Sequence, residues 1–540
     1  MPSASAVPGD TTERTLMGIS PRTRLARRFA AVGTAMLAVL AVVPLAAAPA
    51  SAAVAASPIC LSGSFQYDYQ NAEEGSGKPT RTKPVRNANV ELWGREKAAD
   101  TPHALGVYGL TAVSDGGFNL CYTPTTTTTM NSMWVRFYSE STRMWKVLSQ
   151  SSLYTVDSPV QQNLSASASL GVIKPPAQTS RAWHVLDTLN LLWWGRNNPV
   201  SSCWSAHEPN SGSCTELSVV WGPGAGGGPV YDLNNTIYLS DADPDSEHTV
   251  LHEGGHFLMH RLFNGAWPPD SVCASHYIWS SAGRPCAWVE GFADAVSAYL
   301  LGDNRYVWSS GSSTEFTYGS GWDTGDTVSG NISGSLLDLW RQVDGGWQGT
   351  LKALNDRTPG TFADYFKTVR PAAVPPLAIT GAALDLLAKH TIYYGPMPVG
   401  DGRPHYLSNG GNLVLSHQGT GCMMLPNSYA SIYDKSASDL GQQWRLDTNA
   451  DGTVRIHDGC NPSLSLTSSG YPSYRVTVKP SDAQSASQKW QVTRNDDGSL
   501  KITDPNTGYV LDTPSNQSGM GATLTAPSAT SATQRWTTRD

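Results

Sequence analysis

The sequence predicts a multidomain chain with a β-sandwich first, an α+β domain second and a β-trefoil last. Short strand-like runs broken by turns fill residues 58–174, helical patterns are confined largely to residues 177–395, and a motif recurs every 46 residues within residues 404–540. Residues 396–403 are rich in Gly and Pro, which is typical of a linker. The length of 540 residues also fits about three domains.

Residues 1–52 resemble a signal peptide for export. Four arginines between residues 22 and 28 precede an Ala/Val/Leu-rich run from Phe29 to about Ala48, and Ala50-Ser-Ala52 resembles a signal-peptidase site. A retained membrane anchor is the alternative, because the run nearly has spanning length. The Ala content of the run and the cleavage-like site favour secretion, with a mature chain that begins near Ala53.

Charge and cysteine content exclude some classes of partner. The formal net charge is −7, and removal of the first 52 residues, which carry +5 − 2 = +3, leaves −10 without a basic stretch. We therefore expect no nucleic-acid partner and, after signal removal, no membrane contact. Eight cysteines without CxxC spacing suit an oxidising compartment and pair by proximity. The expected disulfides are Cys60–Cys121, Cys203–Cys214, Cys273–Cys286 and Cys422–Cys460.

The first region is expected to hold strands at residues 65–69, 89–93 and 134–138, which is typical of a small β-sandwich. Pro84–Trp93 followed by Ser114-Asp-Gly-Gly-Phe118 resembles the transthyretin-like, or carboxypeptidase-regulatory-like, modules of secreted proteins. We assign this region no chemistry.

The second region contains the stretch SEHTVLHEGGHFLMH at residues 246–260, for which we predict a helix. Asp243 is a suitable N-cap and Pro244 a suitable first helical residue. Four histidines at residues 248, 252, 256 and 260 share one face of this helix, and two histidines one turn apart can bind one zinc ion. Only His252 is followed by a carboxylate, which gives His252-Glu253-Gly-Gly-His256, the HExxH arrangement of zinc peptidases.

HExxH also occurs by chance on surface helices, but two features favour a metal site. Gly254-Gly255 costs about 1 kcal/mol per glycine inside a helix, which predicts a close backbone approach at this point. Downstream, the segment Trp288–Asp294 places Glu290 and Asp294 four residues apart on one face of a second predicted helix.

With these two motifs the sequence resembles the thermolysin-like gluzincins. The resemblance implies that His252, His256 and Glu290 bind one catalytic Zn²⁺, that Glu253 is the general base, and that Asp294 orients His252. Three protein ligands leave the fourth position to water, and an outer carboxylate fixes the imidazole tautomer. The gap of 34 residues from His256 to Glu290 is longer than usual, and a 14-residue insertion closed by Cys273 and Cys286 accounts for the excess.

The second region departs from the gluzincin pattern in one respect. The histidine that stabilises the tetrahedral intermediate should lie near residues 326–335, and that stretch has none. The remaining candidates are His276, Tyr306, Tyr318 and His390. The metzincin alternative is excluded because position 262 is Leu. Residues 235–240 are predicted to form an edge strand that pairs with an extended substrate.

The third region contains Gln442-Gln-Trp444, Gln488-Lys-Trp490 and Gln534-Arg-Trp536. These motifs resemble the ricin B-type lectin β-trefoil, in which such tryptophans lie in the core. Sugar sites of this family use an aspartate early in a repeat beside an aromatic ring. Only Asp512, in the third repeat, fits, because residues 423–424 are Met-Met and residues 463–466 are Ser-Leu-Ser-Leu. We expect at most one sugar site, at Asp512.

The sequence as a whole predicts a secreted zinc-dependent endopeptidase whose trefoil holds it on a polysaccharide or glycoprotein. Its substrates would be proteins or peptides. The alternative is a carbohydrate-binding secreted or surface protein with an inactive zinc domain, which the missing downstream histidine favours.

Overall fold

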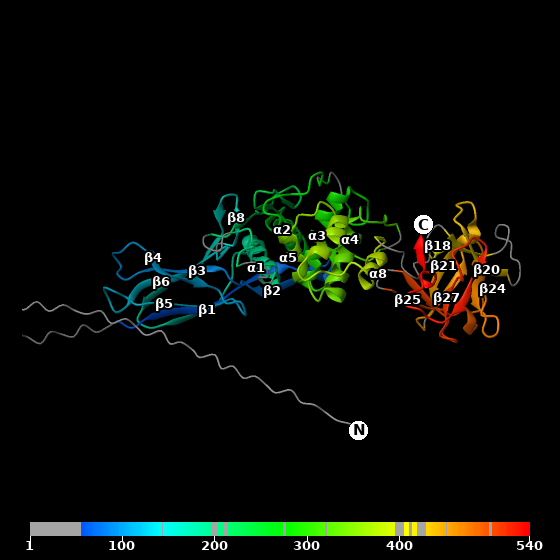
Figure 1. The fold of residues 1–540 in the computed structure, drawn as a ribbon. Helices are drawn as coiled ribbons and strands as arrows, with labels where there is room; N and C mark the ends of the chain where they lie inside the picture. Colours follow the sequence, from blue (N-terminus) through cyan, green and yellow to red (C-terminus); the bar gives the residue numbers. More distant parts are fainter. Residues whose placement is uncertain are drawn as a thin grey trace, which may run out of the picture. The chain divides into compact units, whose positions relative to one another are not determined.

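Strands dominate the two ends of the described chain and helices its middle (Figure 1). The computed structural model describes residues 56–142, 144–196, 202–208, 213–271, 273, 277–318, 321–394, 404–409, 413–417, 428–449, 451–495 and 499–539. The predicted signal peptide, residues 1–52, and the predicted linker, residues 396–403, lie outside these ranges. Within them, no helix has the length and apolar character needed to cross a bilayer.

Two sheets packed face to face form the first region, in blue to cyan in Figure 1. The rings of Phe65 and Phe118 lie 4.1 and 5.2 Å from the ring of Phe137 on the opposing sheet, so aromatic side chains fill the space between the sheets. The three expected strands are present within β1, β3 and β6. One sheet contains β1 (Ile59–Gln70), β2 (Thr80–Pro84), β5 (Gly117–Tyr122) and β12 (Ala168–Ile173), and the other β3 (Asn89–Arg95), β4 (His103–Leu110), β6 (Met130–Tyr138), β10 (Thr155–Asp157) and β11 (Gln161–Leu164).

A third sheet joins residues from both sides of the predicted boundary at residues 174–177. Strand β8 (Trp145–Ser149) runs parallel to β13 (Leu217–Val220), which is parallel to β15 (Thr236–Tyr238). Trp145 is fully buried, and one continuous hydrophobic core includes residues of the first and second regions. The Pro175-Pro176 pair therefore separates two segments that share a sheet and a core. The other strands of this sheet are β7 (Glu140–Ser141), β9 (Ser152–Leu153) and β14 (Val230–Tyr231).

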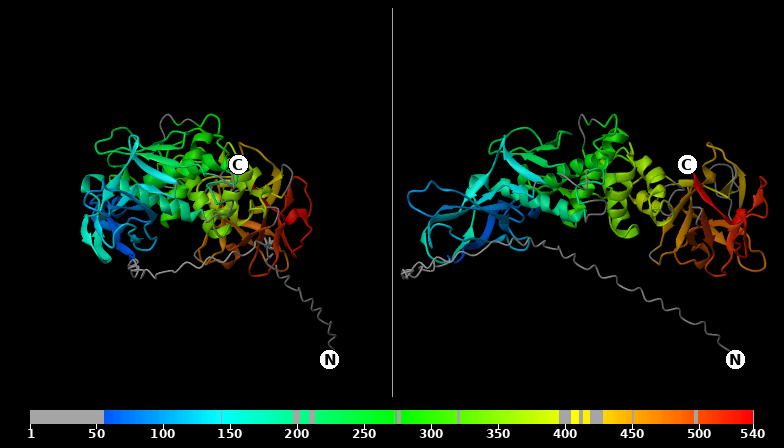
Figure 2. Two further views of the ribbon diagram at one scale, coloured as in Figure 1. Left: turned by 90° about the vertical axis from the view of Figure 1, so that its left-hand side faces the viewer. Right: turned by 60° about the vertical axis from the view of Figure 1, so that its left-hand side comes forward.

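The helices of the second region, green to yellow-green, gather together in every view (Figures 1 and 2). Helix α2 packs between α1 and α3, and α4 packs on α3. The helices are α1 (Ser180–Gly195), α2 (Glu247–Leu262), α3 (Arg284–Leu301), α4 (Ser329–Asp338), α5 (Gln348–Asp356), α6 (Phe362–Asp364), α7 (Arg370–Ala372) and α8 (Ala382–Lys389), with a short hairpin of β16 (Arg305–Val307) and β17 (Ser313–Glu315).

The glycine pair of α2 lies where helices approach closely. A Cβ on Gly255 would stand 2.9 Å from the Cα of Ala293 in α3, and a Cβ on Gly254 would stand 2.9 Å from a side-chain methyl of Leu192 in α1. Contacts this short are not possible for real Cβ atoms, so the predicted close approach is confirmed.

Helix α2 begins later than predicted. Asp243–Asp245 form a separate 3-10 turn, and Ser246 has extended backbone angles (φ −104°, ψ 119°). The Ser246 hydroxyl accepts the amide proton of Thr249 at 3.0 Å, so Ser246 is the N-cap of α2. The prediction that Asp243 caps this helix was wrong because a second capping residue follows three positions later.

The third region, yellow to red in Figure 2, contains the three repeats of the Gln-x-Trp motif at intervals of 46 residues. Trp444, Trp490 and Trp536 are fully buried, and each indole donates to a backbone carbonyl at 2.8–3.1 Å. The glutamine two residues before each tryptophan is buried as well and bonds backbone groups of its own repeat. The predicted structural role of the three motifs is confirmed.

The strands of this region are β18 (Pro404–Ser408), β19 (Leu413–His417), β20 (Ser428–Asp434), β21 (Gln443–Thr448), β22 (Val454–Asp458), β23 (Leu464–Ser468), β24 (Val476–Pro480), β25 (Gln491–Arg494), β26 (Leu500–Thr503), β27 (Val510–Asp512), β28 (Met520–Gly521), β29 (Thr523–Thr525) and β30 (Thr537–Arg539). They bury a hydrophobic core that is separate from the core of the first two regions.

Three of the expected disulfides are present: Cys60–Cys121, Cys203–Cys214 and Cys273–Cys286. The first joins paired residues of β1 and β5. The fourth expected pair includes Cys422, which lies outside the described residues.

Candidate metal centre

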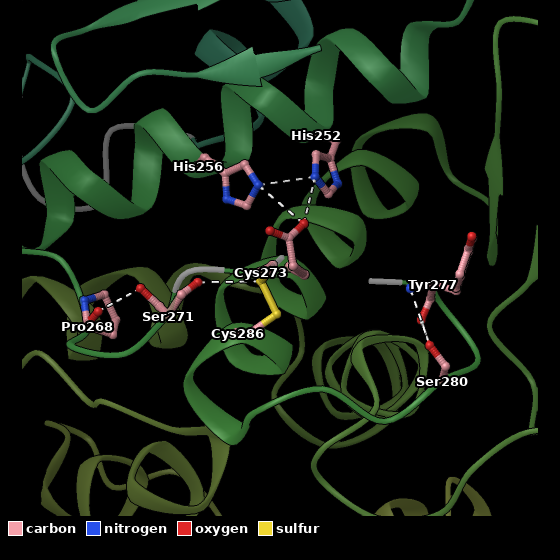
Figure 3. The surroundings of a disulfide bond; sticks show 9 residues. His252, His256, Pro268, Ser271, Cys273, Tyr277, Ser280 and Cys286 are labelled. Carbon is pink, nitrogen blue, oxygen red and sulfur yellow. Dashed lines mark hydrogen bonds and ion pairs between the residues drawn. A yellow bond between two sulfur atoms is a disulfide. The ribbon is translucent and has the colours of Figure 1, made fainter. Parts of the chain in front are cut away.

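Three predicted ligands, two from α2 and one from α3, converge on one point. The Nε2 atoms of His252 and His256 are 3.1 Å apart, and a Glu290 carboxylate oxygen lies 3.2 and 3.5 Å from them. Figure 3 shows the imidazoles of His252 and His256 turned toward each other. All three residues are at least nine-tenths buried. These are the only three His, Cys, Asp or Glu residues of the described chain that group closely enough to bind one metal ion.

The spacing of these atoms fits a small divalent cation. Two nitrogens bound at about 2.0–2.1 Å to a tetrahedral zinc lie about 3.3 Å apart, close to the 3.1 Å between the imidazoles. The donor set of two imidazoles and one carboxylate is one that zinc accepts. The residues present therefore fit a zinc ion.

Asp294 lies one helical turn beyond Glu290 and contacts His252 from behind. One of its carboxylate oxygens is 2.8 Å from His252 Nδ1. An imidazole that donates Nδ1–H to this carboxylate has its Nε2 lone pair free for a metal. The structure thus places Asp294 where the resemblance predicted an orienting carboxylate.

Glu253 lies in the same cleft, beside the short strand β14. Its side chain is 4% exposed, and this burial raises the pKa of the carboxyl group, while His252 and His256 favour the ionised form. The backbone amide of Tyr231 in β14 also interacts with this carboxylate. The carboxylate is therefore fixed between the strand and the candidate ligands.

Strand β14 is the edge of its sheet, with the order β14-β15-β13-β8-β7. The predicted edge strand at residues 235–240 corresponds to β15, which has β13 on one side and β14 on the other. That prediction was wrong because residues 230–238 fold back as a hairpin and place Val230, 49% exposed, at the edge.

A pocket of about 340 Å³ opens above Glu253 and Glu290. Aromatic side chains form much of its wall: Tyr277, Trp279, Tyr306 and Trp308. The Tyr306 ring stands perpendicular to the His252 ring at 5.7 Å, and its hydroxyl lies 3.2 Å from the Thr249 hydroxyl. Burial raises the pKa of Tyr306 well above its usual value, so the phenol is a hydrogen-bond donor at neutral pH.

The other histidines of α2 bind neighbours outside the centre. His248 lies between Glu73 at 2.7 Å and Asp303 at 3.1 Å. Burial opposes the charged form of His248, but the two carboxylates outweigh it and raise the pKa to about 9. His260 Nε2 is 2.9 Å from the carbonyl oxygen of Gly265, and its Nδ1 is 2.7 Å from the Tyr231 hydroxyl.

The candidates for stabilising the tetrahedral intermediate lie in different places in the structure. Tyr306 lines the pocket of the candidate ligands. His390 lines a different pocket and contacts Asp338 at 3.1 Å. Tyr318 is 37% exposed and lines neither pocket, and His276 lies outside the described residues.

The Cys273–Cys286 disulfide ties the loop after α2 to the start of α3 (Figure 3). Cys286 lies in the first turn of α3, and 290 − 286 = 4, so the sulfur bridge is one helical turn from Glu290. The insertion inferred from the long gap is thus fastened beside the candidate metal centre.

Tyr231, Thr249 and three of the pocket aromatics, Tyr277, Trp279 and Trp308, were not identified from the sequence. Thr249 lies on α2 itself. The aromatic residues come from hairpins and loops whose approach to α2 depends on tertiary packing, so no spacing along the chain reveals them. Tyr231 precedes the first residue of α2, Glu247, by 16 residues, and an aromatic residue at that distance belongs to no recognisable motif.

In the third region, Asp512 is 7% exposed. Its carboxylate accepts the Thr513 amide at 2.7 Å, the Thr525 hydroxyl at 2.5 Å and the Gln534 side-chain amide at 3.1 Å. A carboxylate has about four acceptor positions, so little capacity remains for sugar hydroxyls. Sugar binding at Asp512 stays a prediction.

Comparison with known proteins identifies three domains. The mycolysin middle domain matches residues 60–182, the mycolysin C-terminal domain residues 196–391 and the ricin-type β-trefoil lectin domain residues 411–536. None of the curated proteins compared with the chain matches it.

Similar solved structures include a mosquitocidal holotoxin (16% identity, 25% of this chain and 17% of that chain, TM-score 0.23). A second is the designed three-fold symmetric protein ThreeFoil (20% identity, 25% of this chain and 98% of that chain, TM-score 0.23). A third is the C-half of an earthworm R-type lectin in complex with GalNAc (19% identity, 25% of this chain and 99% of that chain, TM-score 0.21). By the three domain matches, the chain combines a mycolysin middle domain and a mycolysin C-terminal domain with a ricin-type β-trefoil lectin domain.

Proposed function

We propose that the protein is a secreted zinc-dependent endopeptidase carried to glycan-bearing surfaces by its trefoil. The observation that carries this proposal is the convergence of His252, His256 and Glu290 on one point, at a pocket that is lined by His252, Glu290 and Glu253. The mycolysin-type domains at residues 60–182 and 196–391 support the same class of activity. The proposed gluzincin-like arrangement and the transthyretin-like origin of residues 58–174 rest on the sequence motifs.

Each side chain of the centre has a distinct task in this proposal. His252, His256 and Glu290 would hold the ion, and Asp294, 2.8 Å from His252 Nδ1, would keep the Nδ1 proton on that ring. A zinc ion in this position supplies Lewis-acid polarisation of a peptide carbonyl and of an attacking water. Glu253 accepts the proton of that water and returns it to the departing amine.

The substrate would be an extended peptide added to the edge of the sheet at β14. Edge strands offer unpaired backbone groups to such a ligand, and Pro229, just before β14, lines the pocket together with Glu253. Binding at an edge leaves both ends of the peptide free, which favours cleavage within chains.

Tyr306 is the proposed donor to the oxyanion. It is the candidate that shares a pocket with Glu253 and Glu290. Its phenol keeps its proton at neutral pH because burial raises its pKa. A preorganised donor at the developing charge contributes about 3–4 kcal/mol in other hydrolases.

The test compares the secreted chain with its Glu253→Gln variant in two measurements, zinc content and casein cleavage. We expect about one zinc per chain in both proteins and a fall in cleavage of at least 1,000-fold in the variant, because a buried proton acceptor is lost. A zinc-loaded parent that does not cleave would favour the alternative of a carbohydrate-binding protein with an inactive zinc domain. A variant as active as the parent would refute the role of Glu253.

A further inference from the structure

A second pocket lies in the third region, where its three repeats meet. Its volume is about 400 Å³, and residues of all three repeats line it. Tyr429, Arg475 and Gly521 occupy equivalent positions, since 475 − 429 = 46 and 521 − 475 = 46. The pocket therefore lies at the pseudo-three-fold axis and does not include Asp512.

Backbone hydrogen bonds between the repeats build the frame of this pocket. The Ala522 amide donates to the Ala430 carbonyl at 2.7 Å, and the Val476 amide donates to the Ala522 carbonyl at 3.1 Å. These three residues are again 46 positions apart, and all three are buried. The side chains one residue before them, at positions 429, 475 and 521, consequently start from a rigid frame.

The three equivalent positions carry very different side chains. The Arg475 guanidinium lies 4.8 Å from the centre of the Tyr429 ring, a cation–π contact that restrains it. The third position, Gly521, has no side chain, and a Cβ built there would meet only the Ser431 hydroxyl at 4.0 Å. Loss of three-fold symmetry thus leaves a space beside a single cation.

The charge of Arg475 is not neutralised within the described part of the chain. The pocket lining contains no Asp or Glu, and the described residues give the guanidinium no ion pair and no hydrogen bond. By contrast, Arg445 pairs with Asp447 and Lys489 with Asp451 in the same region. Arg475 therefore presents its donors to solvent inside a concave surface.

We propose that this axial pocket binds an acidic saccharide through its carboxylate or sulfate group. A planar guanidinium accepts two oxygens of such a group at once. The hydroxyls of Ser431, Ser473 and Thr523 line the same pocket and suit sugar hydroxyls. A volume of about 400 Å³ lies within the range of small-ligand sites. This site is independent of the proposed peptidase cleft and of Asp512.

The test uses isothermal titration calorimetry on the full chain with three sugars: glucuronate, galactose 6-sulfate and galactose. We expect one or both acidic sugars to bind at least 10-fold more tightly than galactose, with affinity that falls as NaCl rises. Comparison of the two acidic sugars distinguishes a carboxylate ligand from a sulfate ligand. Equal affinity for all three would overturn the proposal.

Four variants locate the binding. Arg475→Gln should lower the affinity for the acidic sugar at least 10-fold, and Gly521→Leu, which fills the space, should abolish binding. Gly521→Ala is the matched control and should retain it, because its Cβ meets no close atom. Asp512→Asn should leave acidic-sugar affinity unchanged. Affinity lost in Asp512→Asn and retained in Arg475→Gln would place the ligand elsewhere and refute the axial site.

Discussion

The four histidines of α2 occupy three different environments, although the sequence spaces them identically. His252 and His256 face Glu290, His248 lies between two carboxylates, and His260 accepts a hydrogen bond from Tyr231. Identical spacing thus indicates a shared face but not a shared role. What distinguishes the histidines is the chemistry of the elements packed against each turn.

The His260–Tyr231 bond has a consequence for the proposed peptidase activity. Burial lowers the pKa of His260, so the neutral ring donates to Gly265 and accepts from the phenol. Tyr231→Phe removes that donor and leaves a buried nitrogen unpaired, which costs about 1–3 kcal/mol. Since the Tyr231 amide interacts with Glu253, we expect the kcat/KM for casein peptides to fall about 10-fold with zinc content unchanged.

The control for this variant is Tyr238→Phe in the adjacent strand, where the tyrosine is 45% exposed. It should leave kcat/KM unchanged. If Tyr231→Phe also retains full kcat/KM, β14 does not position Glu253.

At the scale of elements, the N-terminus of α2 is completed by a residue of the first region. One Glu73 carboxylate oxygen accepts the amide protons of Glu247 and His248, at 2.8 and 3.2 Å, and the other contacts the His248 ring. Negative charge stabilises a helix N-terminus. Glu73, 174 residues before Glu247 in the chain, therefore adds to the cap that Ser246 provides.

The pKa of His248 predicts how stability depends on pH. The pKa is about 9 in the folded protein and about 6.5 when unfolded. The ring therefore stabilises the fold fully below pH 6.5, and this contribution, at most about 3 kcal/mol, is lost as pH rises through 9. Calorimetry between pH 6 and 10 should show a steeper fall in Tm for the parent than for His248→Gln. Parallel curves would contradict the ion-pair role.

The close contact of α2 with α3 gives a matched pair of substitutions. Gly255→Ala places a methyl group against backbone atoms of Ala293, which cannot retreat, so unfolding free energy should fall by about 1–3 kcal/mol. Gly254→Ala meets a flexible Leu192 side chain and gains helix propensity of about 1 kcal/mol. Urea denaturation should give a lower free energy of unfolding for Gly255→Ala than for Gly254→Ala. The reverse order would refute this explanation.

The positions of side chains could be predicted from the sequence where a short motif lies within one regular element. HExxH, the Glu290–Asp294 pair and the QxW repeats each span a few residues of regular structure, so spacing alone places their side chains. Prediction from the sequence failed where the outcome depends on long-range packing. The true edge strand β14, the Ser246 cap and the passage of β8 into the sheet of β13 depend on partners that are distant in the chain.

For the whole molecule, two separate hydrophobic cores predict two unfolding events. One core spans Ile59 to Ile392 and the other Leu407 to Trp536. Calorimetry should resolve two unfolding transitions. A zinc chelator should lower the Tm of the first core only, because a ligand stabilises the unit that binds it. Trp490→Ala should lower only the Tm of the second core, in which Trp490 is buried. A single transition shifted by both treatments would show that the cores unfold together.

The cap that Glu73 provides also determines where the chain can be divided to make fragments or gene fusions. A fragment limited to the residues after Pro175 would keep every candidate metal ligand but lose strand β8. It would also lose Glu73, which accepts hydrogen bonds from two backbone amides of α2 and contacts the His248 ring. We therefore expect residues 56–394 to be the smallest segment that keeps the candidate metal centre and its core intact, and the trefoil to have a core of its own. In a gene fusion, a junction before β1 or after Tyr394 leaves residues 56–394 whole, and a junction at Pro175 divides them.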